Sequence, residues 1–165
     1  MTISLIAAVS ENGVIGTGNG GIPWDMPRDK AHFRNYTVGK WMLLGRKTFL
    51  EMEGWFSDQT PVVLSRSDQF EVPGGYRVET IEAAVALAQD HHVPEMVVSG
   101  GATIYELSLP FVNKIVLTRI HAKVDGEIFF PDVPWEQWQL VESIQYPNDD
   151  ENPYNMSMEV FVPNR

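Results

Sequence analysis

The sequence predicts an α/β fold with a mostly parallel central sheet of about eight strands, helices on both faces and a C-terminal antiparallel hairpin. Short apolar runs alternate with helical patterns through residue 108, which is typical of βαβ units. Two later strand-like segments flank a polar acidic loop, which indicates a hairpin. The 165 residues contain no linker, repeat or low-complexity tract, so we expect a single domain over residues 1–165.

The first half of the chain supplies four of the expected strands and two of the expected helices. Residues 2–9 form an apolar run that stops at turn residues, as a buried strand does. Pro27 suits the first turn of a helix over residues 27–38, because its missing N–H costs little there. Further strands are expected over residues 41–45, 61–65 and 76–78, with a helix beginning at Arg46.

The second half continues the alternation and then changes to antiparallel strands. Thr80 is a suitable N-cap for a helix over residues 81–89, where apolar residues recur at helical spacing. A buried strand over residues 95–99 ends at Gly100-Gly101 and precedes a helix over residues 102–108. A long strand over residues 114–122 is followed by the hairpin strands, near residues 138–145 and 156–162.

Composition excludes several classes of protein. Without cysteine the chain has no disulfide, thiolate nucleophile or cysteine metal site, and its histidines (His32, His91, His92 and His121) lack metal-ligand spacing, so no metal is expected. No apolar segment approaches the roughly 18 residues that span a bilayer, and the N-terminus lacks the pattern of a secretory signal. We therefore expect a cytoplasmic protein that does not act on membranes.

Charge is distributed unevenly along the chain. The net charge of −10 argues against nucleic acid as a partner. Residues 28–66, however, hold seven Lys/Arg against four Asp/Glu, whereas residues 67–165 hold five against sixteen. An acidic surface that aids solubility is one interpretation, and a small anionic ligand bound to the basic region is the other.

Three strand ends carry residues suited to phosphate. Gly45-Arg46-Lys47-Thr48 places two cations at a helix start, Ser65-Arg66-Ser67 offers hydroxyls and a guanidinium, and Gly100-Gly101 allows close approach to another helix. Each alone is also typical of an ordinary turn. Together, at equivalent ends of one sheet, they favour a dinucleotide, and the cations favour NADP over NAD.

A glycine-rich loop over residues 13–21 leads through Trp24 to the carboxylate of Asp29. Asp29, Phe33 and Tyr36 are spaced i, i+4 and i+7 and share one helical face. An acid in a first helical turn is favoured by the helix dipole by about 0.3–1 kcal/mol, which would be a purely structural role. The alternative is a partly desolvated carboxylate of raised pKa under a closing lid, where it binds a heterocycle or relays a proton. The adjacent loop favours this second interpretation.

Across essentially its whole length the chain resembles dihydrofolate reductase. The segments that carry the resemblance are Ser4–Ala8, Val14–Gly16, Ile22–Trp24, Pro27–Asp29 with Phe33, Gly45–Phe49, Val63–Ser65, Ser99–Gly101 with Tyr105, Leu117-Thr118 and Gly126–Asp132. Their common order and spacing make the resemblance specific. It implies reduction of 7,8-dihydrofolate to 5,6,7,8-tetrahydrofolate, with hydride from NADPH to C6 and protonation at N5.

The resemblance also assigns expected roles to residues. Asp29, Trp24 and Thr118 are the expected catalytic residues. The expected substrate-binding residues are Ile6, Ala7, Ile22, Lys30, Phe33, Arg34, Met52, Phe56, Gln59, Ser99 and Tyr105. The expected cofactor-binding residues are Ala8, Ile15, Asn19, Gly45, Arg46, Lys47, Thr48, Leu64, Ser65, Arg66, Gly100, Gly101, Ala102, Thr103 and Ile104. A monomer is the family default.

The sequence departs from the family pattern at the substrate site. Gln59 stands where the family has an arginine that pairs with the folate α-carboxylate, and Arg34 is a candidate substitute. Lys30 follows Asp29 at a position that is usually apolar, where its ammonium would lower the pKa of Asp29 or turn to the tail or to water. Ser99 replaces a branched apolar residue, and Gly20-Gly21 lengthens the lid. Gln59 keeps open a related NADPH-dependent reductase of another pterin or of a riboflavin-pathway pyrimidine. A catalytically silent NADPH- or folate-binding module is a further alternative, and the retained Asp29, Trp24 and Thr118 argue against it.

Overall fold

The computed structural model describes residues 1–165 and contains one large sheet, one small sheet and four α-helices. The helices are α1 (Pro27–Thr37), α2 (Arg46–Glu51), α3 (Ile81–Asp90) and α4 (Ala102–Ser108). The large sheet comprises β1 (Thr2–Ser10), β3 (Trp41–Gly45), β4 (Thr60–Leu64), β5 (Tyr76–Val78), β6 (Glu95–Val98), β7 (Lys114–Ile120), β9 (Trp138–Tyr146) and β10 (Met156–Pro163). Short 3-10 turns cover Leu109–Phe111 and Trp135–Gln137.

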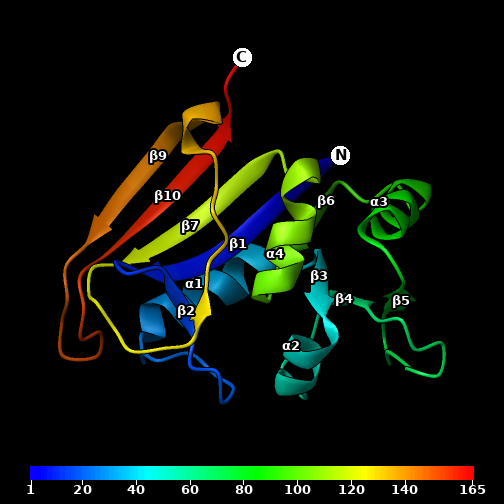
Figure 1. Ribbon diagram of the computed structural model, residues 1–165, viewed down its shortest axis with the longest axis horizontal. Coiled ribbons are helices and arrows are strands. Elements are labelled where there is room, and N and C mark those ends of the chain that lie inside the picture. Colours follow the sequence, from blue (N-terminus) through cyan, green and yellow to red (C-terminus); the bar gives the residue numbers. More distant parts are fainter.

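The large sheet has the strand order β5-β4-β3-β6-β1-β7-β10-β9 (Figure 1). All neighbours from β5 to β7 are parallel, whereas β10 pairs antiparallel with both β7 and β9. A parallel pair needs a crossover connection, and the helices between the early strands supply it. The predicted mostly parallel sheet of eight strands with a C-terminal hairpin is therefore confirmed.

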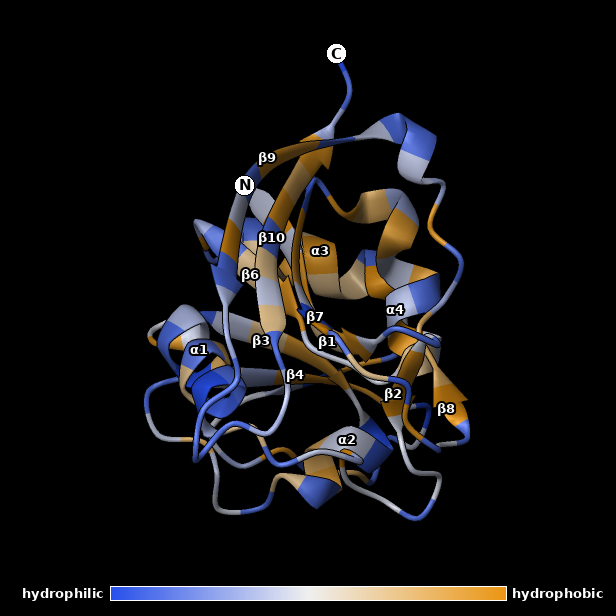
Figure 2. Ribbon diagram, turned by 90° about the vertical axis from the view of Figure 1, so that its left-hand side faces the viewer, coloured by the Kyte–Doolittle hydropathy of each residue, from blue (hydrophilic) through white to orange (hydrophobic).

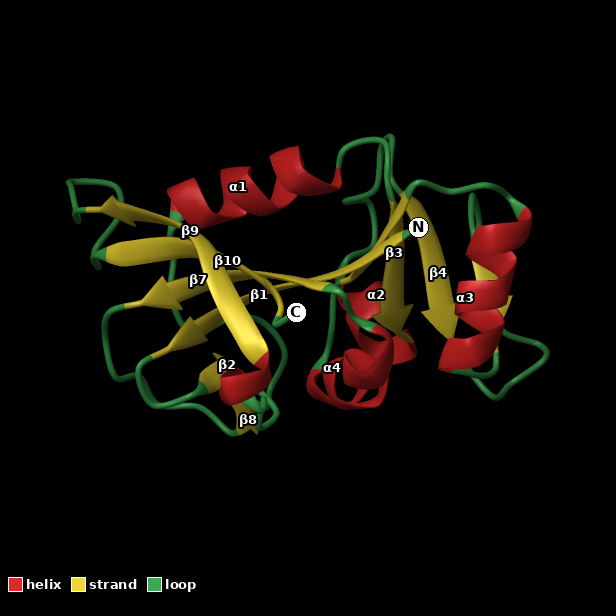
Figure 3. Ribbon diagram, turned by 90° about the horizontal axis from the view of Figure 1, so that it is seen from above, coloured by secondary structure: helices red, strands yellow, loops and turns green.

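Helices cover both faces of this sheet. Seen from above, α1 lies on one face while α2 and α4 lie on the other (Figure 3). Hydrophobic residues concentrate in the central strands β1, β3, β4 and β7, as expected for strands that are covered on both sides (Figure 2). The face beneath α1 is formed by Ile6, Val97 and Val116, against which Phe33 and Tyr36 pack. The i, i+4, i+7 pattern of α1 thus identified its buried face correctly.

A second, two-stranded sheet was not expected from the sequence. β2 (Val14–Gly16) pairs antiparallel with β8 (Ile128–Phe129), which ties the start of the glycine-rich loop to a distant segment. Neither of these two segments carries an alternating apolar and polar pattern, so tertiary contacts decide the pairing. The other predicted elements match within one or two residues, and Thr80 caps α3 by accepting the N–H of Ala83 at 3.0 Å.

Candidate active site

The three phosphate-suited segments meet at one edge of the large sheet. β4, β3 and β6 are consecutive and parallel, so their carboxyl ends place residues 45–48, 65–67 and 100–101 side by side. The N–H of Gly45 donates to the carbonyl of Gly100 at 2.8 Å and joins two of these segments directly. The sequence predicted this arrangement, because parallel strands have their carboxyl ends at the same edge of the sheet. Ligands of such sheets bind at that edge.

Glycines keep side chains out of this edge. Gly100 has a φ of +113°, a conformation that strains other residues, and the Gly100–Gly101 peptide is cis. A Cβ atom added to Gly101 would lie 3.3 Å from Thr48 Oγ1, and one added to Gly45 would lie 3.1 Å from Ile104 Cγ1. Glycine at these positions therefore lets the ends of β3 and β6 pack closely against α2 and α4, and it leaves the backbone there without side chains.

Several cations of the basic region have no acidic partner. Five of the twelve Lys and Arg side chains form ion pairs with carboxylates. Within residues 28–66 the unpaired cations are Arg34, Arg46, Lys47 and Arg66. Arg46 and Lys47 also line a shallow cavity of about 560 Å³ beside α2. Because ion pairing leaves these four charges free, the basic region of the sequence is available to an anionic ligand.

Asp29 lies in the first turn of α1 and is buried, with 8 % of its surface exposed. Burial raises the pKa of Asp29 to about 6, while interactions with the side chains of Thr118 and Trp24 favour the ionised form and limit the rise. Thr118 and Trp24 are themselves buried. The structure thus brings the three predicted catalytic residues together from α1, β7 and the loop before α1. A carboxyl group of this pKa exchanges a proton near neutral pH.

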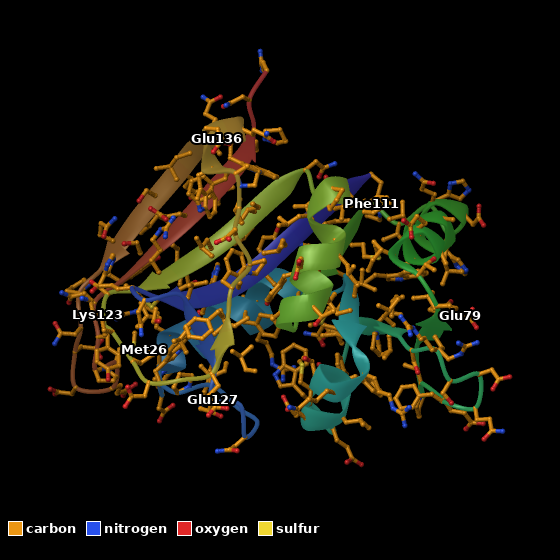
Figure 4. The ribbon with its side chains drawn as sticks, in the orientation of Figure 1. Met26, Glu79, Phe111, Lys123, Glu127 and Glu136 are labelled. Atoms are coloured by element: carbon orange, nitrogen blue, oxygen red, sulfur yellow. The ribbon has the colours of Figure 1, made fainter.

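The glycine-rich loop is held against two distant elements. Thr17 Oγ1 donates to the carbonyl of Gly20 at 2.8 Å and tightens the tip of the loop. A Cβ atom on Gly18 would lie 2.6 Å from Glu127 Oε2, and one on Gly20 would lie 3.4 Å from Glu51 Oε1 of α2. Glu127, labelled in Figure 4, lies beside this loop at the end of the molecule that also carries α2. The loop therefore lies between Glu127, which directly precedes β8, and Glu51 of α2.

Aromatic rings form one wall of the site next to α1. The ring centres of Phe33 and Trp55 are 5.3 Å apart, as are those of Trp55 and Phe56. The Arg34 guanidinium lies over the Trp55 ring at 3.9 Å from its centre, and its Nη2 donates to the Trp55 carbonyl at 2.9 Å. Trp55 was not among the expected site residues. It lies in a loop, where no periodic pattern indicated which way its ring would point.

Three expected substrate residues have other partners. Lys30 is exposed and its Nζ lies 2.9 Å from Asp25 Oδ1, so it turns away from Asp29 and contributes no shift to its pKa. Gln59 is 5 % exposed and its amide is used internally: Oε1 accepts the N–H of Ser57 and Nε2 donates to Thr37 Oγ1. Ser99 Oγ donates to the carbonyl of Val97 at 3.1 Å. In each case a local polar partner that the sequence pattern did not identify decided the orientation.

The remaining expected residues lie around the same edge and lid. Tyr105 is buried, and its hydroxyl donates to the carbonyl of Ile6 at 2.7 Å, which ties α4 to β1. Asn19 and Ile22 are exposed on the lid. The other expected residues lie in β1 (Ala7, Ala8), in β2 (Ile15), in or after α2 (Thr48, Met52, Phe56), at the end of β4 or directly after it (Leu64, Ser65) and in the first turn of α4 (Ala102, Thr103, Ile104).

No group of three or more His, Cys, Asp or Glu side chains is arranged to hold a metal ion. No helix has the length and apolar character needed to cross a membrane.

Comparison with known proteins relates both the sequence and the fold to one family. The family model described as "Dihydrofolate reductase" matches residues 2–162. The chain is 38 % identical over 154 residues to dihydrofolate reductase type 3 of Salmonella typhimurium, covering 93 % of each chain. It is 37 % identical over 155 residues to the dihydrofolate reductase of Haemophilus influenzae, covering 94 % of each. A solved dihydrofolate reductase from Enterococcus faecalis, complexed with NADP(H) and RAB-propyl, superposes with a TM-score of 0.90 at 29 % identity, covering 99 % of this chain and 97 % of the other.

Proposed function

The chain belongs to the dihydrofolate reductase family and reduces 7,8-dihydrofolate to 5,6,7,8-tetrahydrofolate with NADPH, and we propose that Asp29, Trp24 and Thr118 are the catalytic residues of this reaction. The observation that carries the proposal is the buried Asp29 carboxyl, in contact with Thr118 and Trp24, near the carboxyl ends of the sheet strands. Its pKa of about 6 lets it hold a proton in a site from which the lid excludes water.

The residues at the sheet edge fit NADPH. The glycines at 45, 100 and 101 leave the backbone at this edge without side chains, and backbone of this kind suits the pyrophosphate. The unpaired Arg46, Lys47 and Arg66, with the Ser65 hydroxyl, suit the 2′-phosphate, because guanidinium groups bind phosphate in a bidentate manner. When bound, NADPH supplies the hydride for C6 of the substrate.

Asp29 and Thr118 orient the pterin in this proposal. An ionised Asp29 accepts hydrogen bonds from the 2-amino group and N3 of the ring, and the protonated form holds the proton that is needed at N5. Thr118 lies against the same carboxyl group and limits the cost of ionising it. Trp24 packs with Met26, which Figure 4 labels, in a small hydrophobic cluster that also contains Ile120 and Met156.

The anionic glutamyl tail requires a cation at the substrate side of the site. Arg28, Lys30 and Lys40 are each paired with a carboxylate, whereas Arg34 bonds only to neutral groups of Trp55 and Ser57. We infer that Arg34, held over Trp55, takes the place of the arginine that Gln59 replaces. The uncharged, internally bonded Gln59 then supports the loop and does not pair with the tail.

We also propose that residues 1–165 act as a single domain and a monomer in the cytoplasm. One sheet contains strands from the N-terminal and the C-terminal parts of the sequence. The reaction draws on NADPH, which cells keep reduced in the cytoplasm.

The test is NADPH oxidation followed by absorbance, with dihydrofolate and with a dihydropterin that lacks the glutamyl tail. We expect turnover of both, with a lower KM for dihydrofolate. Asp29→Asn should remove most of the turnover and leave NADPH binding nearly unchanged. Wild-type turnover in this variant would exclude Asp29 from the mechanism.

A further inference from the structure

The helix that carries Asp29 has no N-cap of its own. α1 begins at Pro27, and Met26 in the N-cap position offers no side-chain acceptor. The first intrahelical bond runs from the N–H of Lys30 to the Met26 carbonyl, and Pro27 has no N–H. The N–H of Arg28 is therefore left without a partner inside the helix, at the residue directly before Asp29.

This N–H finds its acceptor 124 residues further along the chain. Asn152, in the loop between β9 and β10, accepts the Arg28 N–H at its Oδ1 atom, at 3.0 Å. Asn152 is buried, with 5 % of its surface exposed, although it lies in a loop of mostly exposed residues. A buried amide in an exposed loop must be held by hydrogen bonds, since an unpaired one is costly.

Asp149 fixes the orientation of that amide. Its Oδ1 atom accepts the backbone N–H of Asn152 at 2.8 Å and the Nδ2 of the same residue at 2.9 Å. Because Nδ2 is committed to Asp149, Oδ1 is the atom that faces Arg28. The backbone N–H of Glu151 also donates to Asp149, at 2.9 Å.

The side chain of Arg28 also binds to this loop. Its Nη2 pairs with Asp149 Oδ2 at 2.8 Å, and its Nη1 donates to the Pro147 carbonyl at 3.1 Å. The guanidinium also lies over the Tyr146 ring, 5.1 Å from its centre. Both the backbone and the side chain of the residue before Asp29 are thus held by one loop.

We propose that Asn152, oriented by Asp149, is a positioning residue for Asp29: it supplies the N-cap of α1 from a distant loop and so sets where the carboxyl group lies in the site. The inference rests on the proposed function, because it assumes that Asp29 acts in turnover. Without the Asn152 acceptor the first turn frays, and Asp29 moves relative to Thr118 and Trp24. NADPH, which the proposed site binds at other strand ends, is not affected.

The test compares Asn152→Ala with Asn148→Ala. Asn148 belongs to the same exposed loop and its side chain makes no hydrogen bond, so it is a matched control. For Asn152→Ala we expect kcat to fall roughly three- to tenfold, with the Kd for NADPH within about twofold of wild type. The midpoint of its pH profile should shift, because movement of Asp29 changes both the burial that raises its pKa and the Thr118 and Trp24 contacts that lower it. Asn148→Ala should match wild type in kcat, in the Kd for NADPH and in the midpoint of the pH profile.

If Asn152 only stabilised the fold, the result would differ. Asn152→Ala would then melt at lower temperature but, well below that temperature, keep the wild-type kcat and pH profile, and this would overturn the inference. If Asn152→Ala does not fold, Asp149→Asn carries the test, with an expected fall in kcat of about twofold; unchanged kcat and pH profile would again overturn it. Absence of turnover in wild type itself would instead refute the proposed function, so the two failures are distinct.

Discussion

The guanidinium of Arg34 lies 3.9 Å from the centre of the Trp55 ring, and Arg34 forms no ion pair. A cation held over an aromatic face is oriented without being neutralised, which leaves its remaining N–H groups for an anion. Arg34→Ala should therefore raise the KM for dihydrofolate about tenfold with little change in kcat, and should leave the KM for a tail-free dihydropterin unchanged. Steady-state kinetics on both substrates measure this. Asn35→Ala, at an exposed neighbour, is the control. Equal effects of Arg34→Ala on both substrates would show that Arg34 does not bind the glutamyl tail.

Replacing Asp29 should impair turnover in a manner that depends on pH. Asp29→Asn removes the group that holds a proton near pH 6 in the buried site, so the reaction must rely on substrate protonated in solution. We expect kcat to fall by about 10²–10⁴-fold at neutral and high pH and by less at low pH. Stopped-flow or steady-state rates between pH 5 and 9 measure this. A uniform loss across that range would contradict a role in protonation.

The same substitution should stabilise the fold above about pH 6. The folded pKa of Asp29, about 6, is higher than its ordinary value of 3.8, so the folded state holds the proton more tightly than the unfolded state. Its stabilising contribution is therefore fully present below the unfolded pKa and is lost as pH rises through the folded pKa. Asp29→Asn avoids the buried charge and should gain about 1–3 kcal/mol at pH 7.5, with the gain shrinking toward pH 4.

Urea unfolding of Asp29→Asn at the two pH values measures this gain. Asp68→Asn is a suitable control, because Asp68 is exposed. A gain that is equal at pH 4 and pH 7.5 would show that burial of the charge is not its cause.

Arg66→Ala should weaken the discrimination between NADPH and NADH. Arg66 is exposed, lies at the end of β4 and has no acidic partner, so we place it at the 2′-phosphate. Loss of a charged hydrogen bond should raise the Kd for NADPH about tenfold and leave the Kd for NADH unchanged. Fluorescence titration with both dinucleotides measures the ratio. Lys123→Ala is the control. If Arg66→Ala raised the Kd for NADPH and the Kd for NADH equally, Arg66 would not bind the 2′-phosphate.

Gly126→Ala should loosen the base of the lid. A Cβ atom there would lie 2.4 Å from Val14 Cγ1 and 2.6 Å from the Gly16 carbonyl, both on β2. Since backbone cannot yield as a flexible side chain does, we expect β2 and β8 to separate and the free energy of unfolding to fall by about 1–3 kcal/mol. Hydrogen exchange at Val14 and Gly16 should accelerate. Unchanged protection of these amides would show that the β2–β8 pairing does not need a glycine at this position.

The sequence determined most of the architecture, because each long element carries its own periodic signal. The apolar run before the glycine loop, the shared face of Asp29, Phe33 and Tyr36, and the Thr80 cap all depend on neighbours along the chain. The location of the phosphate-suited segments at one edge of the sheet was also predictable, since parallel strands align their carboxyl ends.

Only the tertiary structure decided the orientations and the partners that come from distant segments. Lys30 pairs with Asp25, and the Gln59 amide bonds to Thr37, because those groups were within reach once the loops had folded. Asn152 meets the Arg28 N–H across 124 positions, a contact that no local pattern encodes. Periodicity reports which face of an element is buried, whereas a single hydrogen bond between distant loops depends on where the rest of the chain places both partners.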